Sequence, residues 1–537
     1  MKITIIVVIF LLLSLIVNIV LHRNKRRRIK ESWAHKHQYG QEPLSSVSSY
    51  WHNKKRTAQI VDDYTWHDLN LDEVYERIKF TYTSPGSEKL YALLREIHLE
   101  GEPHQQREAF LKKLSASPAL QEKLQPILYD IGKRNGTNSS AYMLAIEDKQ
   151  IPQQWLYTLC SVLPFLSLAC AFYSIKIAIF LFFGCIILNT LIYTSKKDAY
   201  EREFFSLLYA ISIIYGAKRI AKLNINDELV PHLKKLKPLY KYRYLISNNK
   251  ETPFEIVMDY FRTFFLVDFF IYRRIMKHLK NQQEAAAYVW EWIAEIDVCF
   301  SILHMRTHYT YSIPTFTDDL IVTCEEMYHP LLEKPVKNTF STAGDVLITG
   351  SNASGKSTFM KSLALNCILA QTINTAFADS FQMKRTAIFT SFAINDSLLQ
   401  GESYFIAEMN SLKRMLETIE KGILCITFID EILKGTNTIE RISASAAILT
   451  WLAAQKNNLT FVASHDIELY QICEGMYEGY YFEGVIEHNE IRFTYLIQKG
   501  DTYVKNALAL LKLKEFPATI VQQAEQLSNN YVATGRW

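Results

Sequence analysis

The N-terminus carries a long uncharged apolar run. Ile3 to Leu21 is 19 residues without a charge, close to the roughly 20 residues that a helix needs to cross a bilayer. A secretory signal peptide fits less well, because only Lys2 precedes the run and six cations follow it where a cleavage site of small residues is expected. We therefore predict a transmembrane helix over residues 1–21.

A second apolar block predicts a helical hairpin. Leu156–Tyr173 and Ile177–Tyr193 are interrupted only by Ser174–Lys176, and Lys196 and Lys197 follow. The basic run after the first span and these two lysines then fall on one side of the bilayer. The positive-inside rule places that side in the cytoplasm, with the N-terminus outside. A hairpin buried in a soluble protein is the less favoured alternative.

The aromatic stretch Asp259–Ile275 resembles a further span in its apolar content. Its five charged residues would all enter lipid, however, and an unpaired charge in a bilayer is costly. They are Asp259, Arg262, Asp268, Arg273 and Arg274. We therefore predict a helix in a protein core or interface.

After Asp345 the pattern changes to short apolar segments that alternate with helical ones. Asp345–Thr349 predicts a buried strand, and Ser357–Leu369 predicts an amphipathic helix. Such alternation is typical of an α/β domain with a mostly parallel sheet that is covered on both faces.

The loop between that strand and that helix predicts a phosphate site. Gly350, Gly355, Lys356 and Ser357 fit the spacing G-x-x-x-x-G-K-[ST], in which backbone N–H groups surround the phosphates of a nucleotide. Lys356 would contact the β- and γ-phosphates, and the Ser357 hydroxyl would bind Mg²⁺. The predicted nucleotide contacts are Gly350, Ser351, Asn352, Ala353, Ser354, Gly355, Lys356, Ser357 and Thr358.

A second apolar strand supplies carboxylates. Ile423–Ile429 is apolar apart from Thr427 and is followed by Asp430 and Glu431. At the carboxyl end of a strand, Asp430 would hold Mg²⁺ through water and Glu431 would polarise the attacking water. His465 follows the segment "LTFVAS" and is a candidate sensor of the γ-phosphate, although a lone histidine at a strand end is more often structural.

These motifs resemble the MutS mismatch-repair family, a branch of the ABC-type ATPases. The similar segments are "TGSNASGKSTFMKSLALN", "FIDEILKGTNT", "SHD", "GESYFIAEM" and the tail "TYVKNALALLKL" with "FPATIVQQAEQL". The likeness covers roughly residues 58–133 and 285–530. It implies an ATPase that uses ATP and Mg²⁺ and acts as a homodimer. In such a dimer Ser403, within "GESYFIAEM", touches the γ-phosphate in the partner subunit, unless this segment is an ordinary amphipathic helix.

Two departures from the family bear on DNA. No Phe-x-Glu motif, the family's mismatch reader, occurs before the hairpin. The net charge is +4, and the six cations of Arg23–Lys30 leave −2 for the rest of the chain, which gives little attraction to DNA phosphates. Next to a membrane span this basic run favours topology or anionic lipid over nucleic acid. Glu333–Asn338 also lacks the aromatic residue expected against adenine.

The length of 537 residues predicts two or three domains. The eight cysteines show no C-x-x-C pair, so we interpret them as reduced, buried thiols. We predict a multi-pass protein of the cell membrane with its ATPase domain in the cytoplasm. The predicted segments are a transmembrane helix (1–21), a cytoplasmic helical segment (22–154), a transmembrane hairpin (155–194), a helical core or lever (195–306), the α/β P-loop ATPase domain (307–500) and a helical dimerisation tail (501–537).

Two function classes remain open from the sequence. One is a nucleotide-switched membrane protein whose ATPase dimer engages an unknown protein or lipid partner. The other is a DNA-binding clamp of mismatch-repair or recombination type that is tethered at the membrane.

Overall fold

The computed structural model describes most of the chain. The described residues are 19–21, 23–36, 42–54, 59–134, 136–137, 139–144, 154–246, 260–350, 354–392, 404–433, 436–487, 490–500 and 516–534. They form a mixed α/β protein with a helical majority. Most of the predicted N-terminal span therefore lies outside the described residues, as does part of the predicted tail.

Two compact units divide the chain, and their segments interleave. The helical unit contains Met1–Arg56, Ile78–Ala92 and Gln106–Thr307, and the α/β unit contains Thr57–Arg77, Leu93–Gln105 and His308–Trp537. Two short segments from the N-terminal half thus join the α/β unit, which the hydropathy pattern does not indicate. The predicted domain limits stay predictions.

The helical unit packs around its last helix, α15 (Gln283–His308), in which Trp290, Val298 and Phe300 are fully buried. Its other helices include α2 (Leu44–Val47), α3 (Ser49–Asn53), α6 (Ser84–Leu94), α7 (Gln105–Ala116), α8 (Pro118–Ile131), α9 (Ser139–Met143), α10 (Gln154–Ala169), η1 (Cys170–Phe172), α11 (Ile175–Ala221), α12 (Leu229–Leu236), η2 (Lys237–Ile246) and α14 (Val267–Asn281).

A buried carboxylate fixes the start of α6 against α15. Asp297 accepts hydrogen bonds from the backbone N–H of Tyr82 at 2.9 Å and of Thr83 at 2.7 Å. A Cβ at Gly86 would lie 2.1 Å from an oxygen of this carboxylate. Glycine is therefore required at position 86, because only a residue without a side chain lets the two helices approach this closely.

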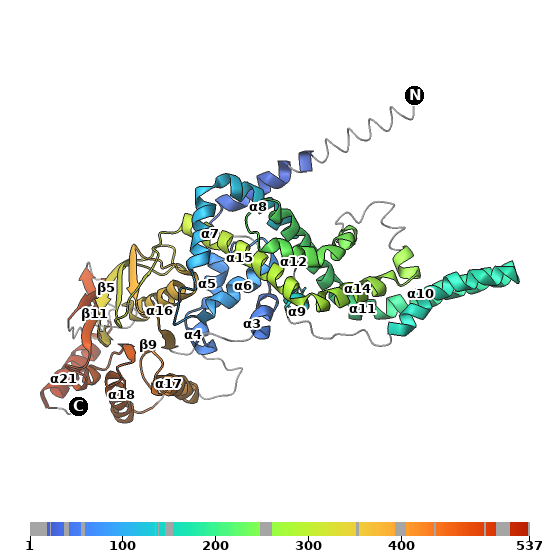
Figure 1. Ribbon diagram of the computed structural model, residues 1–537. Helices are drawn as coiled ribbons and strands as arrows, with labels where there is room; N and C mark the ends of the chain where they lie inside the picture. Colours follow the sequence, from blue (N-terminus) through green and yellow to red (C-terminus); the bar gives the residue numbers. More distant parts are fainter. Residues whose placement is uncertain are drawn as a thin grey trace. The chain divides into compact units, whose positions relative to one another are not determined.

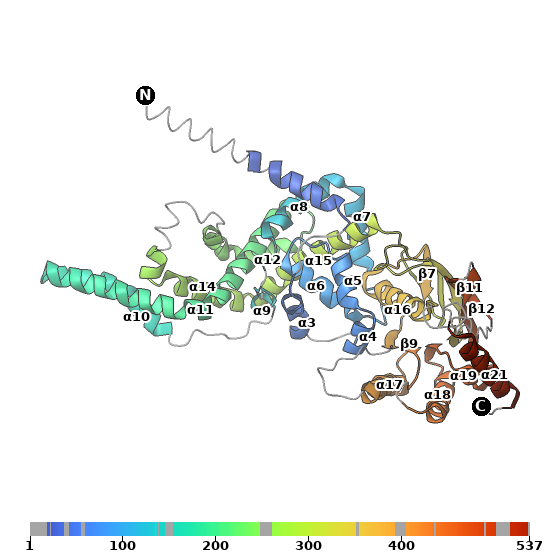
Figure 2. The same cartoon turned by 180° about the vertical axis from the view of Figure 1, so that it is seen from behind.

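Helices α10 and α11 lie side by side as a hairpin whose turn is η1 and Ser174 (Figures 1 and 2). Among the residues that the structure describes, three helical stretches are long and apolar enough to cross a membrane: Trp155–Phe172, Ile175–Ser195 and Arg202–Ala221. The first two match the predicted hairpin and are largely exposed. The third is 61% buried inside the protein, so packing against the other helices explains its apolar character.

The aromatic stretch predicted as one helix is broken. Residues 260–264 are helical, a turn follows at 265–266, and α14 begins at Val267. Leu266, in the turn, has a left-handed backbone with φ of 51°. The expected burial holds for Asp268 and Phe269, whereas Tyr260 and Phe261 are exposed.

The α/β unit is built on two larger sheets and a short pair. The main sheet has the strand order β12-β11-β6-β10-β9-β8, in which only β12 is antiparallel to its neighbour. The strands are β6 (Val346–Thr349), β8 (Ala387–Ser391), β9 (Cys425–Asp430), β10 (Asn458–Ala463), β11 (Glu478–Glu487) and β12 (Glu490–Lys499). This mostly parallel arrangement agrees with the alternation of apolar segments after Asp345.

The smaller elements complete the unit. A second sheet contains β3 (Thr315–Phe316), β7 (Ser380–Met383), β4 (Val322–Met327) and β5 (Asn338–Thr342), and β1 (Gln59–Ile60) pairs with β2 (Glu96–Ile97). The helices are α4 (Asp63–Asp68), α5 (Leu71–Ile78), α16 (Lys356–Ile373), α17 (Tyr404–Glu420), α18 (Thr438–Ala453), α19 (Ile467–Ile472) and α21 (Ala518–Thr534).

Helices cover both faces of the main sheet. On one face Leu412 of α17 and Leu449 of α18 pack in a cluster with Ile429 of β9. On the other face Phe359 of α16 packs against Phe340, whose ring also faces Phe461 of β10. As a result α16 is buried on almost every side, rather than amphipathic as its sequence predicted.

Candidate functional site

The predicted phosphate loop connects β6 to α16. Gly350 has φ of 143° and Gly355 has φ of 110°, a backbone conformation that side chains disfavour. A Cβ at Gly350 would lie 3.0 Å from the Phe482 carbonyl oxygen. Ser351, Asn352 and Ala353 lie outside the described residues. Both glycines are thus required by the turn itself.

Polar groups of the loop point inward. The Lys356 side chain is only 5% exposed, and its Nζ donates to the Gly350 carbonyl oxygen at 2.5 Å. The Ser354 hydroxyl is buried, and no hydrogen-bond partner for it lies among the described residues. Thr358, one turn into α16, is exposed. A buried ammonium group at the loop is suited to an anionic ligand, because opposite charges attract more strongly where water is excluded.

Ser357 and Asp430 meet at the carboxyl edge of the parallel sheet. The Ser357 hydroxyl donates to Asp430 Oδ2 at 2.5 Å, although 73 residues separate the two positions. Asp430 ends β9 and is 7% exposed. Oxygen atoms of this kind suit Mg²⁺, which typically takes one or two protein carboxylates and completes its shell with phosphate and water.

Glu431 and His465 form a second pair beside this one. His465 Nδ1 lies 2.9 Å from Glu431 Oε1, and this contact with Glu431 is the main cause that raises the pKa of His465. Glu431 has φ of 61°, and its N–H donates to the Ala463 carbonyl of β10 at 2.9 Å. A left-handed backbone in glutamate is uncommon, and such residues gather at functional sites.

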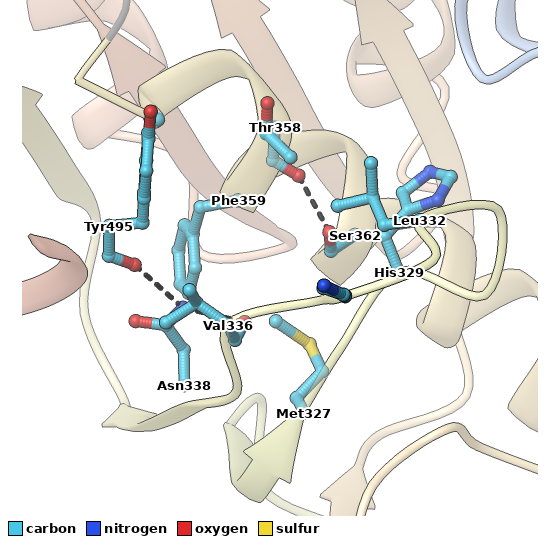
Figure 3. A pocket seen from close by; sticks show the side chains of 11 residues that line it. Met327, His329, Leu332, Val336, Asn338, Thr358, Phe359, Ser362 and Tyr495 are labelled. Carbon is cyan, nitrogen blue, oxygen red and sulfur yellow. Dashed lines mark hydrogen bonds between the residues drawn. The ribbon is translucent and has the colours of Figure 1, made fainter. Parts of the chain in front are cut away.

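A cavity of about 240 Å³ opens beside the loop. Figure 3 shows Tyr495 and Phe359 on one side of it and Leu332 and His329 on the other. Burial lowers the pKa of His329 to about 4, with Lys361 adding to the effect, so His329 is neutral at pH 7. Apolar side chains and polar ones, Lys334 among them, therefore line the cavity together.

Tyr495 is the residue that sequence reasoning missed. The segment Glu333–Asn338 supplies Val336 to the cavity but no aromatic ring; the ring comes from β12, far along the chain. Asn338 holds this part of β12 in place, because its Nδ2 donates to the Tyr495 carbonyl at 3.0 Å and its Oδ1 accepts from Ile497 N–H at 2.8 Å. Only the alternation of aromatic residues in "RFTYL" hints at this strand.

Ser403 is not placed by the structure. It lies outside the described residues, and α17 begins at Tyr404. The same helix does reach the carboxylate segment, because Glu408 accepts a hydrogen bond at 2.5 Å from Leu433 N–H, two residues after Glu431. The structure therefore brings together Gly350, Ser354, Gly355, Lys356, Ser357, Thr358, Asp430, Glu431 and His465, and leaves the remaining predicted site residues as predictions.

Comparison with known proteins identifies the relatives of this part of the chain. Residues 346–531 match the family model MutS domain V. The DNA mismatch repair protein MutS of Pseudothermotoga lettingae is 27% identical over 48% of this chain and 33% of its own length. The MutS of Alkaliphilus oremlandii is 28% identical over 44% of this chain and 28% of its own.

A human relative gives a similar result. MutS protein homolog 4 of Homo sapiens is 33% identical over 44% of this chain and 27% of its own length. The chain thus spans about a third or less of the length of these curated relatives. The matched segment contains the loop, both carboxylates and His465 described above, and this part of the chain is similar to domain V of the MutS family.

Proposed function

We propose that this protein is a membrane-anchored ATPase of the MutS type, which binds and hydrolyses ATP to change conformation. The observation that carries the proposal is the joint position of the Ser357–Asp430 pair and the Glu431–His465 pair beside a glycine-dependent loop. Phosphoryl transfer needs a loop that binds phosphate, oxygen atoms that bind a metal ion and a carboxylate that orients the attacking water. Together they support an α/β P-loop ATPase domain of the ABC type.

The residues fit ATP and Mg²⁺. The buried Ser354 hydroxyl and the backbone around Gly355 would face the phosphates, and Lys356 would leave the Gly350 carbonyl to contact them. Ser357 and Asp430 would hold Mg²⁺, which neutralises charge that develops on the phosphate oxygens. Among the described residues no group of three His, Cys, Asp or Glu could hold a metal by itself, so the proposed shell depends on phosphate and water oxygens.

Glu431 and His465 would control the attacking water. A carboxylate that is only 15% exposed can accept a hydrogen bond from water and orient it. In the present arrangement the same carboxylate is paired with His465, so the histidine competes with water for it. Release of His465 toward the γ-phosphate would free Glu431, which links the histidine's proposed sensing role to the onset of hydrolysis.

The test is phosphate release by purified full-length protein in detergent, with Glu431→Gln compared with wild type. We expect hydrolysis to fall at least about 100-fold, because the variant loses the group that activates water, while ATP binding is kept. Glu417→Gln is the matched control, since Glu417 lies on α17 with a side chain 52% exposed. Equal activity in wild type and Glu431→Gln would remove Glu431 from this role.

Anchoring would come from the α10–α11 hairpin together with the predicted N-terminal helix. The hairpin windows Trp155–Phe172 and Ile175–Ser195 are only 28% and 11% buried inside the protein, and exposed apolar helices of this length suit a bilayer. We propose that residues 22–154 and 195–537 both lie in the cytoplasm, on the side of the membrane that holds the basic residues next to the spans. The ATP-driven conformational change would then act on a protein or lipid partner.

A DNA clamp is the second candidate, because two of the relatives are named as DNA mismatch repair proteins. One observation weighs against the clamp, because part of the basic run forms ion pairs within the chain. Lys25 pairs with Asp130, and Lys30 lies 3.2 Å from Glu122. Binding of duplex DNA by the full chain in detergent, measured over a range of salt, separates the candidates. Tight binding with a steep loss in salt would favour the clamp.

A further inference from the structure

The broken aromatic helix packs against the base of the hairpin. The short helix 260–264 and α14 both lie beside α10 and α11 in the two views (Figures 1 and 2). The turn between them contains Leu266, which is fully buried and has φ of 51°. A left-handed backbone conformation at leucine costs free energy and persists only where the surrounding packing holds it. The packing of the helical unit therefore stabilises this break.

Arg262 and Asp268, two of the charged residues that made a membrane location unfavourable, form an ion pair with each other. Arg262 donates from Nε to Asp268 Oδ1 at 2.6 Å and from Nη2 to Oδ2 at 3.0 Å, across the break. The Tyr193 hydroxyl of α11 donates to the same carboxylate at 3.1 Å. Ionisable groups in membranes are found paired in this way, so the two-pronged contact lowers the cost of placing Arg262 and Asp268 next to lipid.

Aromatic and polar contacts tie the segment to the apolar part of the hairpin. The rings of Phe265 and Phe165 stack with centroids 4.7 Å apart. Asn189, 1% exposed, donates from Nδ2 to the carbonyls of Cys160 at 2.9 Å and Phe264 at 2.8 Å. The Asn189 amide thus joins α10, α11 and the broken helix at a single point within the proposed span.

The position along α10 gives the depth of this contact. Phe165 follows Trp155, the start of the apolar window, by ten residues, which is roughly 15 Å along a helix. The hydrocarbon core of a bilayer is about 30 Å thick. A hairpin that enters the bilayer at Trp155 therefore carries Phe265 well into the core.

The outer surface of the segment is apolar and continuous with the hairpin. Tyr260 is 59% exposed and Phe261 is 44% exposed, and Phe165 and Leu166 of α10 are 53% and 55% exposed. Resting on the proposed anchoring of the hairpin, we infer that residues 260–266 form a membrane-inserted half-helix. Its exposed side contacts lipid acyl chains, and the Arg262–Asp268 pair connects the short helix to the start of α14.

The test places a photoreactive side chain at the proposed lipid contact. Full-length protein carrying Phe261→p-benzoylphenylalanine is reconstituted in vesicles of equal parts phosphatidylethanolamine and phosphatidylglycerol, and the adducts are identified by mass spectrometry. The same substitution at Phe180, 79% exposed in the hairpin, reports anchoring, and at Tyr311, 37% exposed in the α/β unit, it serves as the control. A parallel sample substituted at Tyr260 provides a second position if the Phe261 variant misfolds.

We expect lipid adducts at Phe261 and Phe180 and none at Tyr311. Adducts at Phe180 without any at Phe261 or Tyr260 would overturn the half-helix and leave the anchored ATPase intact. A cross-link from Phe261 to protein would overturn it as well, since the occupant would then be a polypeptide. Absence of lipid adducts at Phe180 would refute the anchoring and, with it, this inference.

Discussion

At the scale of single residues, Tyr495 offers the sharpest test of the nucleotide site. If its ring stacks on the base of ATP, Tyr495→Ala should weaken ATP binding about 10- to 100-fold, since base–aromatic stacking contributes about 1–3 kcal/mol per base. Tyr495→Phe keeps the ring and should bind as wild type does. Titration with a fluorescent ATP analogue measures both. Equal affinity of the alanine variant would place the base elsewhere.

Glu88 allows a prediction about pH and stability. Its side chain is 1% exposed, and burial is the main cause that raises its pKa to about 8. Between its ordinary pKa of 4.5 and about 8, the folded chain holds a proton that the unfolded chain has lost. Stability must therefore fall as pH rises through this window, by about 1.4 kcal/mol per pH unit at most.

Glu88→Gln should remove this dependence, because glutamine resembles the protonated acid at every pH. We expect the variant to match wild type near pH 5 and to unfold at higher urea concentration near pH 8. Glu122→Gln, with a side chain 59% exposed, is the control and should give no such difference. A constant gap between Glu88→Gln and wild type across pH would show that Glu88 is ionised in the folded protein.

At the scale of elements, the sequence predicted those features that depend only on residues close to one another along the chain. The loop at Gly350–Ser357 and the strand before Asp430 were readable because their chemistry depends on neighbours in sequence. The continuation of α11 beyond residue 195 was not, because a helix can extend past an apolar stretch with its backbone hydrogen bonds intact and without any local sequence signal. Likewise, the arrival of Tyr495 beside the loop depends on a strand pairing that no local pattern encodes.

Helix α4 is another element that only the fold places. It lies against β8, the edge strand of the main sheet, where Asp68 Oδ2 accepts from the Thr390 hydroxyl at 2.7 Å and from Phe392 N–H at 3.0 Å. Burial is the main cause that raises the pKa of Asp68. Contact with α4 thus covers an edge that would otherwise be open to pairing with other chains.

Asp68→Ala should leave two buried donors unpaired, each of which costs about 1–3 kcal/mol. We expect faster hydrogen exchange at Thr390 and Phe392 and a lower unfolding midpoint for the α/β unit. Asp68→Asn keeps one acceptor and should show a smaller effect. Asp63→Asn, at a side chain 80% exposed, should leave exchange in β8 unchanged; unaltered exchange in Asp68→Ala would mean that α4 does not protect the edge.

At the scale of the whole molecule, we propose that each ATP site is completed by a second chain. We expect ATP to close a homodimer in which Ser403 of one subunit contacts the γ-phosphate held by Lys356 of the other. A helix N-terminus near Ser403 would favour that charge, so ATP should stabilise the closed pair more than ADP does. The helical tail and the shared membrane would raise the effective concentration of the two subunits.

Mixing two inactive variants tests this arrangement. Lys356→Ala chains and Ser403→Arg chains should each lack activity, but a mixed dimer has one composite site with both defects and one with neither. Random pairing makes half of the dimers mixed, so phosphate release should recover to roughly a quarter of wild type, as expected for independent sites. Light scattering verifies that dimers form. If they form and the mixture stays as inactive as each variant alone, Ser403 acts within its own chain or not at all.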